Sequence, residues 1–280
     1  MFNRQLVLLK LIQALEKKNM ASGTAIVKAL FLLKEEYGLG AKIKFYSFYP
    51  YQYGPFSQLC FADLRQLKSS GLVDEEEKSL TKEGKKAIDS CKLEFDTQLT
   101  DLTNRFKTTN QMIKYIYSKY PQYAAKSLLV EHENKQANGF CTIGYEGRDI
   151  DTFLDALIQN NVNTVIDVRN NPFSMNFCFI KDKLKEFLSK AEIDYMHIPE
   201  LGIESGHRQN LKTKEDYKTL FKLFKQTMLP KHKDKLKQVG ELTKEKRIAL
   251  MCFEKDKEFC HRNILSEELE AMGYGEGMHL

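Results

Sequence analysis

The stretch TVIDVR at residues 164–169 decides the fold class of the C-terminal half of the chain. Its β-branched and apolar residues are typical of a buried strand. Short apolar runs also occur at residues 140–143, 195–198 and 247–252, residues 278–280 are expected to add a last strand, and helical patterns separate these runs. Strands that alternate with helices predict an α/β fold with a parallel sheet and helices on its faces.

Polar, sharply turned segments follow the predicted strands. They read GYEGR at residues 144–148, DVRNNPFS at 167–174, PELG at 199–202 and CFEKDKEFCHR at 252–262. Ligands of parallel α/β sheets bind outside the carboxyl ends of the strands, and buried acids, arginines and thiols are costly unless paired or used. We therefore expect one polar site at this edge, formed by Asp167, Arg169, Cys252, Glu254, Cys260, His261 and Arg262.

The same segments resemble domain-of-unknown-function family 488 in their motifs and in their order along the chain. The resemblance implies a Rossmann-like α/β fold and a loose association with nucleic acids or DNA repair, but no settled activity. Members often have a small residue where this chain has Phe253, which leaves the specificity open. The match spans residues 140–280 and rests on TIGY at 142–145, DVR at 167–169 with Pro172 and Ser174, Leu201-Gly202, CFEK at 252–255 and CHR at 260–262.

Two thiols and a carboxylate are candidates for catalysis. Cys260 is expected in the first turn of the last helix, where the helix dipole and Arg262 would lower the pKa of a nucleophilic thiol; a buried structural thiol is the alternative. Cys252 ends a strand and is either a second candidate nucleophile or a core residue. Glu254 is a candidate general acid or base if burial raises its pKa, or else the partner of Arg169 or Arg262.

The remaining candidates concern orientation and anion binding. Asp167 is expected to orient Arg169 or His261, which places Asp167 and His261 among the candidate catalytic residues. Arginines at the strand ends, together with the N-terminus of the last helix, predict a phosphate site. The candidate ligand-binding residues are Tyr145, Arg148, Arg169, Ser174, Glu200 and Arg262.

A metal site competes with these interpretations. Cys252, Cys260 and His261 offer soft ligands, and Asp167 or Glu254 offers a hard one. However, adjacent residues such as Cys260 and His261 seldom bind one zinc ion, and the six cysteines of the chain contain no C-x-x-C spacing. We therefore predict no metal from the sequence and leave the cofactor unassigned.

The first 90 residues predict a separate domain. Two amphipathic segments precede the aromatic stretch FYSFYPYQYGPFS at residues 45–57. A helix that Ser57 can cap, a short hairpin and a further helix are expected to follow it. This is the order of a winged helix. The motifs YGPFS, GLV and LTKEG resemble those of antitoxin-like Panacea and phage-associated domains, and this resemblance implies partner binding or DNA-linked regulation. The tyrosines suit either packing or stacking on bases. Residues 91–139 are expected to form a helical connector and a polar linker that ends the domain.

Composition sets the limits of the functional hypothesis. The chain has 280 residues and a net charge of +5, which permits nucleic-acid binding without demanding it. No apolar run approaches the roughly 20 residues of a membrane span, so we expect a cytoplasmic protein with no membrane partner. The first hypothesis is an enzyme acting on a nucleotide or nucleic acid, whose N-terminal domain holds DNA, RNA or a protein partner, a second copy included. The alternatives are a non-catalytic DNA-binding regulator that senses a small anionic ligand, and an antitoxin-like defence component.

Overall fold

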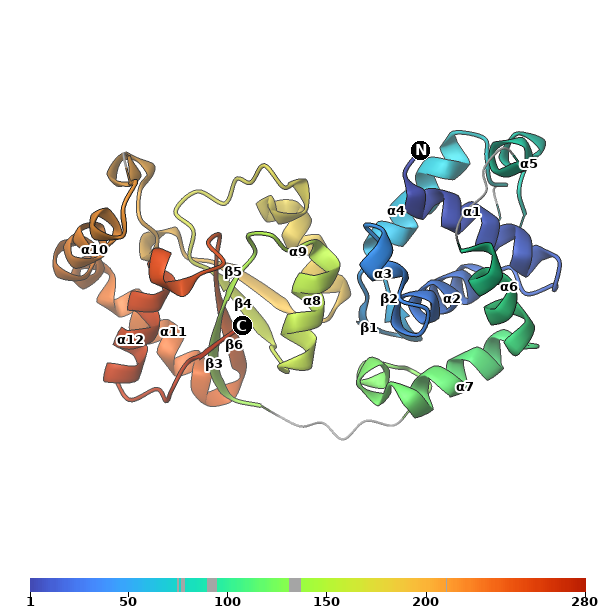
Figure 1. The fold of residues 1–280 in the computed structure, drawn as a ribbon. Helices are drawn as coiled ribbons and strands as arrows, with labels where there is room; N and C mark the ends of the chain where they lie inside the picture. The colour runs from blue at the N-terminus through green and yellow to red at the C-terminus, as the bar shows by residue number, and fades with distance from the viewer. Residues whose placement is uncertain (75, 77–78, 90–94, 131–136, 210) are drawn as a thin grey trace. The chain divides into compact units, whose positions relative to one another are not determined.

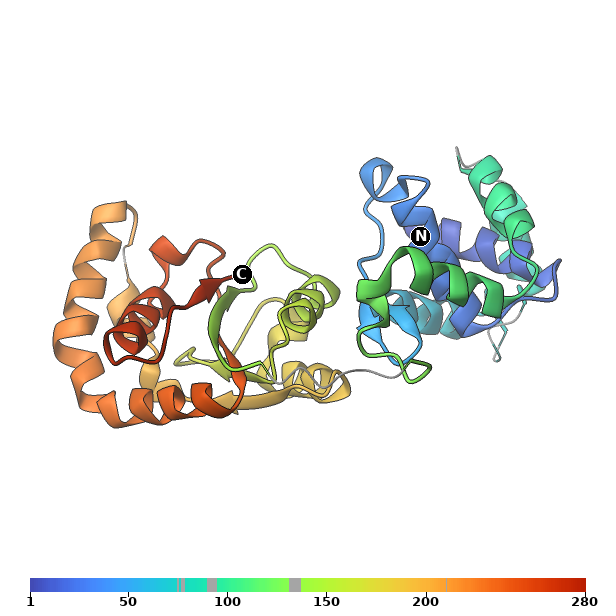
Figure 2. The same cartoon turned by 90° about the horizontal axis from the view of Figure 1, so that it is seen from below.

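The structure is a computed structural model that describes residues 1–280 except 75, 77–78, 90–94, 131–136 and 210. The chain divides into two compact units, Met1–Glu133 and Asn134–Leu280, which Figures 1 and 2 show in two views. Much of the predicted linker over residues 131–139 lies outside the described residues. Among the helices that the structure describes, none has the length and apolar character needed to cross a bilayer.

The N-terminal unit is mostly helical. Its core forms where α1 and α2 pack their apolar faces together. Helix α6 packs on both of them, and α7 packs on α2. The segment predicted as a helical connector therefore contributes two helices to this unit. The described elements are α1 (Asn3–Glu16), α2 (Gly23–Glu35), α3 (Leu39–Lys42), β1 (Tyr49–Tyr51), β2 (Gly54–Phe56), α4 (Gln58–Ser69), α5 (Lys82–Asp89), α6 (Asp96–Arg105), α7 (Thr109–Lys119) and the 3₁₀ turn η1 (Pro121–Ala124).

The aromatic stretch folds into the antiparallel β1–β2 hairpin. Phe48 and Tyr49 are buried, whereas Tyr53 at the turn is 47% exposed, so packing accounts for most of the pattern. The Ser57 hydroxyl accepts a hydrogen bond from the Cys60 amide at 3.2 Å and caps α4 as expected. Where the sequence predicts a short hairpin after α4, the described residues form one antiparallel bridge, between residues 73 and 80. Part of that segment lies outside the described residues. The winged-helix resemblance remains a prediction.

One lysine of the N-terminal unit lies inside its core. Lys28 of α2 is 3% exposed, and its Nζ donates a hydrogen bond to the Pro55 carbonyl oxygen at 2.8 Å. Burial lowers the pKa of this ammonium group from 10.5 to about 7, because a charged group loses its hydration in the core. The side chain therefore links α2 to the hairpin, and its ammonium group loses its proton near neutral pH.

The C-terminal unit contains a five-stranded sheet in the order β5-β4-β6-β3-β7. All four strand pairings are parallel, which confirms the predicted α/β architecture. Helices α8 and α9 lie on one face of the sheet, and α10, α11 and α12 lie on the other (Figure 1). The elements are β3 (Gly139–Gly144), α8 (Ile150–Gln159), β4 (Thr164–Asp167), η2 (Phe177–Phe179), α9 (Lys181–Lys190), β5 (Asp194–His197), η3 (Pro199–Leu201), η4 (Ser205–Arg208), α10 (Lys214–Leu223), the π-helical turn η5 (Phe224–Met228), η6 (Leu229–His232), α11 (Lys233–Glu245), β6 (Arg247–Cys252), η7 (Lys257–Phe259), α12 (Arg262–Ala271) and β7 (Met278–His279).

The pleat of β4 and β6 sorts the residues at the strand ends between the two faces. Ile166 and Val168 share one core with Leu250 and Cys252, on the face that α11 and α12 cover. Successive side chains of a strand point to opposite faces. Asp167 therefore points to the face of α8 and α9, although it lies at the same edge of the sheet as Cys252.

Candidate functional site

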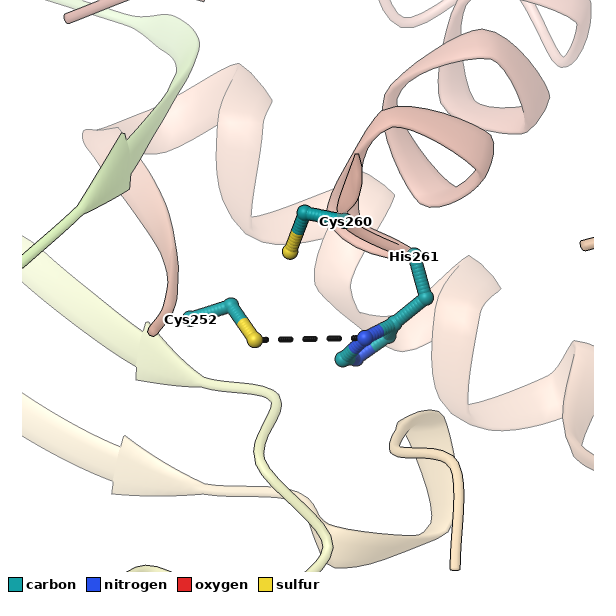
Figure 3. A group of neighbouring side chains, drawn as sticks. All are labelled: Cys252, Cys260 and His261. Atoms are coloured by element: carbon teal, nitrogen blue, oxygen red, sulfur yellow. Dashed lines mark hydrogen bonds between the residues drawn. The ribbon is translucent and has the colours of Figure 1, made fainter. Parts of the chain in front are cut away.

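Two thiols and an imidazole meet at the carboxyl end of β6. Figure 3 shows Cys252 at the end of the strand and Cys260 with His261 at the start of α12, their side chains pointing toward one another. One ligand atom from each residue lies within 4.8 Å of the others. The residues are at most 2% exposed. The structure thus brings together three of the predicted catalytic residues in a buried cluster, which we call the Cys-Cys-His cluster.

Hydrogen bonding fixes the orientation of the His261 ring. Its Nε2 lies 3.0 Å from the carbonyl oxygen of Val168, and a carbonyl can only accept, so Nε2 carries the proton. In the neutral ring Nδ1 is then the nitrogen with the free lone pair, and it faces the Cys252 sulfur at 3.9 Å (Figure 3). The hydrogen bond to Val168, the residue after β4, therefore selects the neutral tautomer whose lone pair points into the cluster.

Glu254 connects the cluster to the surface. Its Oε2 accepts a hydrogen bond from the Cys252 thiol at 3.3 Å, and its Oε1 pairs with the guanidinium of Arg208. Burial acts to raise the pKa of this carboxyl, but the Arg208 charge and hydrogen bonds from both thiols outweigh it and hold the pKa below its usual value. The condition of a raised pKa, under which Glu254 was a candidate general acid or base, is therefore not met, and the ionised carboxylate is suited to accept a proton rather than to donate one.

The environment of Cys260 also differs from the expectation. This residue precedes α12, whose N-cap is His261. Complete burial and the neighbouring Cys252 thiol raise the pKa of Cys260 well above its usual value, and His261 offsets this only in part. The lowered pKa predicted from the helix dipole and Arg262 is wrong, because the loss of hydration on burial is the largest influence on this thiol.

Asp167 and Arg169 form a second polar group, on the opposite face of the sheet. The two Asp167 carboxylate oxygens accept hydrogen bonds from Arg169 Nε at 2.9 Å and Nη2 at 2.6 Å, and Tyr195 donates to the same carboxylate at 2.7 Å. Arg169 Nη1 donates to the Tyr145 hydroxyl and to the Phe179 carbonyl. Asp167 thus orients Arg169 and not His261. The single polar site that we expected is two groups of residues, one on each face of the sheet.

Arg262 is occupied with the main chain rather than with a ligand. It is 2% exposed and donates hydrogen bonds to the carbonyl oxygens of Glu254 and Lys255. The end of β3 presses against the same segment, because a Cβ on Gly144 would lie 1.9 Å from the Glu254 carbonyl oxygen. Arg262 and Gly144 therefore hold the backbone that presents Glu254, and the phosphate role predicted for Arg262 is not available to its guanidinium in this arrangement.

An open cavity of about 570 Å³ lies at the strand ends beside these groups. Arg148 reaches it, and within the described part of the chain its side chain has no hydrogen bond or ion pair. Phe173 and Phe253, which also line the cavity, are 63% and 44% exposed. Predicted residues in the lining are Tyr145, Arg148, Arg169 and Ser174, whereas the exposed Glu200 is not among them; further lining residues are Glu146, Gly147, Asn170, Asn171, Met175, Asn176, Ile203, Ser205 and Arg208.

Arg208 and Phe173 are the residues that sequence reasoning missed. Arg208 belongs to η4, a short turn with no apolar period to place it, and only its pairing with Glu254 shows its role. Phe173 stood in the quoted strand-end segment, but a lone aromatic residue in a loop is an ordinary packing residue. Its exposure at a cavity is the signal that distinguishes it, and exposure is not readable from sequence.

The fold and the cluster define a parallel α/β domain with a buried thiol–imidazole group at its strand ends. Residues 149–269 match the family model described as Domain of unknown function DUF488. The match covers most of the C-terminal unit and supports the resemblance seen in the motifs. No curated protein and no solved structure matches the chain significantly.

Proposed function

We propose that the C-terminal unit is an enzyme that binds a phosphate-bearing, nucleotide-like substrate in the strand-end cavity and acts on it beside Glu254. The observation that carries this proposal is Arg148, a cation that lines the cavity and has no partner for its side chain among the described residues. An arginine left unpaired in a concave site is suited to bind phosphate through its planar set of donors.

The aromatic residues of the cavity favour a substrate with a planar ring. Phe173 and Phe253 offer exposed faces, and base–aromatic stacking is worth about 1–3 kcal/mol per base. Tyr145, which also lines the cavity, packs against Phe253 in a T-shaped contact with ring centroids 5.3 Å apart and stacks on Phe179 with centroids 4.3 Å apart. A free nucleotide and a nucleotide within a single strand share this chemistry.

The chemical step is assigned to the Glu254 carboxylate, which is not in the cavity lining itself but links a lining residue to the Cys-Cys-His cluster. Glu254 contacts the cavity residue Arg208 and the Cys252 thiol. Its carboxylate accepts a proton from the nucleophile that attacks the bound substrate, while Arg208 holds the carboxylate in place. The role of the N-terminal unit as a holder of DNA, RNA or a protein partner remains an expectation, with no contact of the described residues to favour one of them.

Binding is tested by calorimetric titration of the full chain with inorganic phosphate, a nucleoside, the matching nucleoside monophosphate and a short single-stranded oligonucleotide. We expect the nucleotide to bind more tightly than phosphate or nucleoside alone. Arg148→Ala should weaken nucleotide binding about tenfold or more, because a hydrogen bond to a charged group contributes about 1.5–3 kcal/mol. Lys237→Ala, which removes an exposed cation on α11, is the matched control and should bind normally.

Turnover is tested by mass spectrometry of each ligand after incubation with the chain. Glu254→Gln should abolish product formation and keep nucleotide affinity within a few-fold. Equal binding by wild type and Arg148→Ala, or no binding of any nucleotide, refutes the phosphate site. Nucleotide binding without any product favours the alternative, a sensor of an anionic ligand. Preference for the oligonucleotide over the monophosphate identifies a nucleic acid as the substrate class.

A further inference from the structure

We propose that Cys252, Cys260 and His261 bind a divalent metal ion of the zinc class through Cys252 Sγ, Cys260 Sγ and His261 Nδ1. This inference goes beyond the proposed function, because it concerns an ion inside the fold and not the ligand in the cavity. It also departs from the sequence-based prediction of no metal, which rested on the rarity of adjacent zinc ligands.

The three donor atoms already converge on one point. They lie within 4.8 Å of one another, and Cys252 Sγ is 3.9 Å from His261 Nδ1. Ligand atoms of a tetrahedral ion with Zn–S bonds of about 2.3 Å and Zn–N bonds of about 2.0–2.1 Å lie about 3.5–3.8 Å apart, so metal binding would draw the three side chains together by up to about 1 Å. Cys260 has an extended backbone, with φ −131° and ψ 132°, whereas His261 has helical angles, with φ −61° and ψ −19°. This change of direction at the start of α12 lets two adjacent side chains reach the same ion.

The orientation of His261 is that of a metal ligand. Histidines that bind metals usually donate the other ring N–H to a carbonyl or carboxylate, which fixes the tautomer and turns the lone pair to the ion. Here Nε2 donates to the Val168 carbonyl oxygen at 3.0 Å, and Nδ1 faces the Cys252 sulfur. The hydrogen bond that holds a histidine ligand in its binding orientation is therefore already present.

Charge balance also fits a divalent ion. A metal binds thiolates, so both cysteine protons would leave to solvent on binding, and the two negative sulfurs would cancel the charge of the ion. The Glu254 carboxylate that touches the cluster is already paired with Arg208. The buried group is then neutral as a whole, which avoids the large cost of an uncompensated charge in a site that is at most 2% exposed.

The donor set selects the kind of ion. Two thiolates and an imidazole favour zinc and similar borderline-soft ions over magnesium or calcium, which prefer oxygen ligands. Three protein ligands leave one position of a tetrahedral ion, and this arrangement is typical of catalytic zinc sites that hold a water molecule. Glu254 Oε2, 3.3 Å from the Cys252 sulfur, lies beside the cluster as an oxygen donor or as a proton acceptor for such a water.

The test uses the full chain purified without chelators, with zinc and cobalt(II) as probes. Native mass spectrometry and elemental analysis are expected to give about one zinc ion per chain. Cobalt(II) added after removal of zinc should produce the near-ultraviolet sulfur-to-cobalt charge-transfer absorption, which reports thiolate ligands in the unaltered protein. This second readout does not depend on whether a variant folds.

Variants identify the ligands. Cys252→Ser and His261→Ala should reduce the bound zinc at least tenfold, whereas Cys178→Ser, which removes a partly exposed thiol outside the cluster, should keep it. A chain that neither retains zinc nor binds cobalt(II) overturns the proposal, as does recovery of Cys252 and Cys260 as a disulfide from reduced, metal-supplied protein. Equal loss of zinc in Cys178→Ser overturns the ligand assignment.

The metal site and the proposed function fail independently in these experiments. Zinc content is measured with no nucleotide present, and nucleotide binding is tested through Arg148, which is not a ligand. Zinc binding with no nucleotide affinity would refute the proposed function alone. Nucleotide affinity in a chain that binds neither zinc nor cobalt(II) would refute the metal site alone.

Discussion

Replacing the buried Lys28 with methionine is expected to stabilise the N-terminal unit at neutral pH and to flatten the pH dependence of its stability. Methionine keeps an unbranched apolar stem of similar length but has no ammonium group. The substitution removes the cost of burying a cation and loses the hydrogen bond to the Pro55 carbonyl, which is worth about 1 kcal/mol net.

The size of the effect follows from the pKa of Lys28, which falls from 10.5 to about 7 on folding. Each pKa unit corresponds to about 1.4 kcal/mol, so the charged form costs the folded state roughly 5 kcal/mol at acidic pH. Between the two pKa values the unfolded chain binds a proton that the folded chain has released, so stability rises with pH in this window. The rise from pH 7 to pH 9 is about 2 kcal/mol, with little change below pH 7.

Urea-dependent methionine oxidation resolves the two units within the full chain. Met112 in α7 and Met251 in β6 are both buried, and each becomes reactive toward peroxide when its own unit unfolds. For the wild type, the urea concentration at the midpoint of Met112 oxidation should rise between pH 7 and pH 9. In Lys28→Met the rise should disappear, with a gain of roughly 3 kcal/mol at pH 7.

Lys17→Met, which changes an exposed lysine at the end of α1, serves as the control and should keep the pH dependence of the wild type. The midpoint of Met251 should be unaffected by either substitution. A wild type with equal Met112 midpoints at both pH values, or a Lys28→Met variant with a lower midpoint at pH 7, would show that burial does not govern the energetics of this lysine.

Two further predictions concern the C-terminal unit, and both are checked by the urea midpoint of Met251 oxidation. Gly144→Ala should destabilise it by about 1–3 kcal/mol or more, because the new Cβ meets the Glu254 carbonyl oxygen at 1.9 Å, whereas Gly206→Ala, which meets nothing within 4 Å, should have little effect. Asp167→Asn should cost about 3–5 kcal/mol by leaving the Arg169 cation buried without its partner, and adding Arg169→Met should recover part of the loss. Unchanged midpoints in Gly144→Ala or Asp167→Asn would refute the respective contact.

The sequence predicted the parallel sheet and the edge at which polar residues gather, because strand periodicity and the carboxyl-end rule are local and general. It did not predict that the pleat separates Asp167 from Cys252. That separation depends on the register between β4 and β6, in which Asp167 pairs with Met251. Register is a long-range property that a single strand does not encode, and a shift by one residue would exchange the faces.

Burial was the other quantity that the sequence could not supply. His261 acts to lower the pKa of Cys260, but complete burial and the Cys252 thiol outweigh it, and burial depends on what the rest of the chain packs around the thiol. The same holds for Arg262, whose donors are taken up by main-chain carbonyls. Residue types and spacing identified the site residues, whereas their roles could be assigned only from the distances between them in the structure.

The strand order has a consequence for how this domain is synthesised. β6 lies between β4 and β3, yet it follows both of them in the chain by about a third of the protein's length. Until residues 247–252 leave the ribosome, the facing edges of β3 and β4 have no hydrogen-bonding partner, and unpaired edges invite association with other chains. A stop codon before β6 also removes β7 and therefore leaves both edges of β3 and one edge of β4 without a partner, whereas one after α12 removes only the two-residue strand β7.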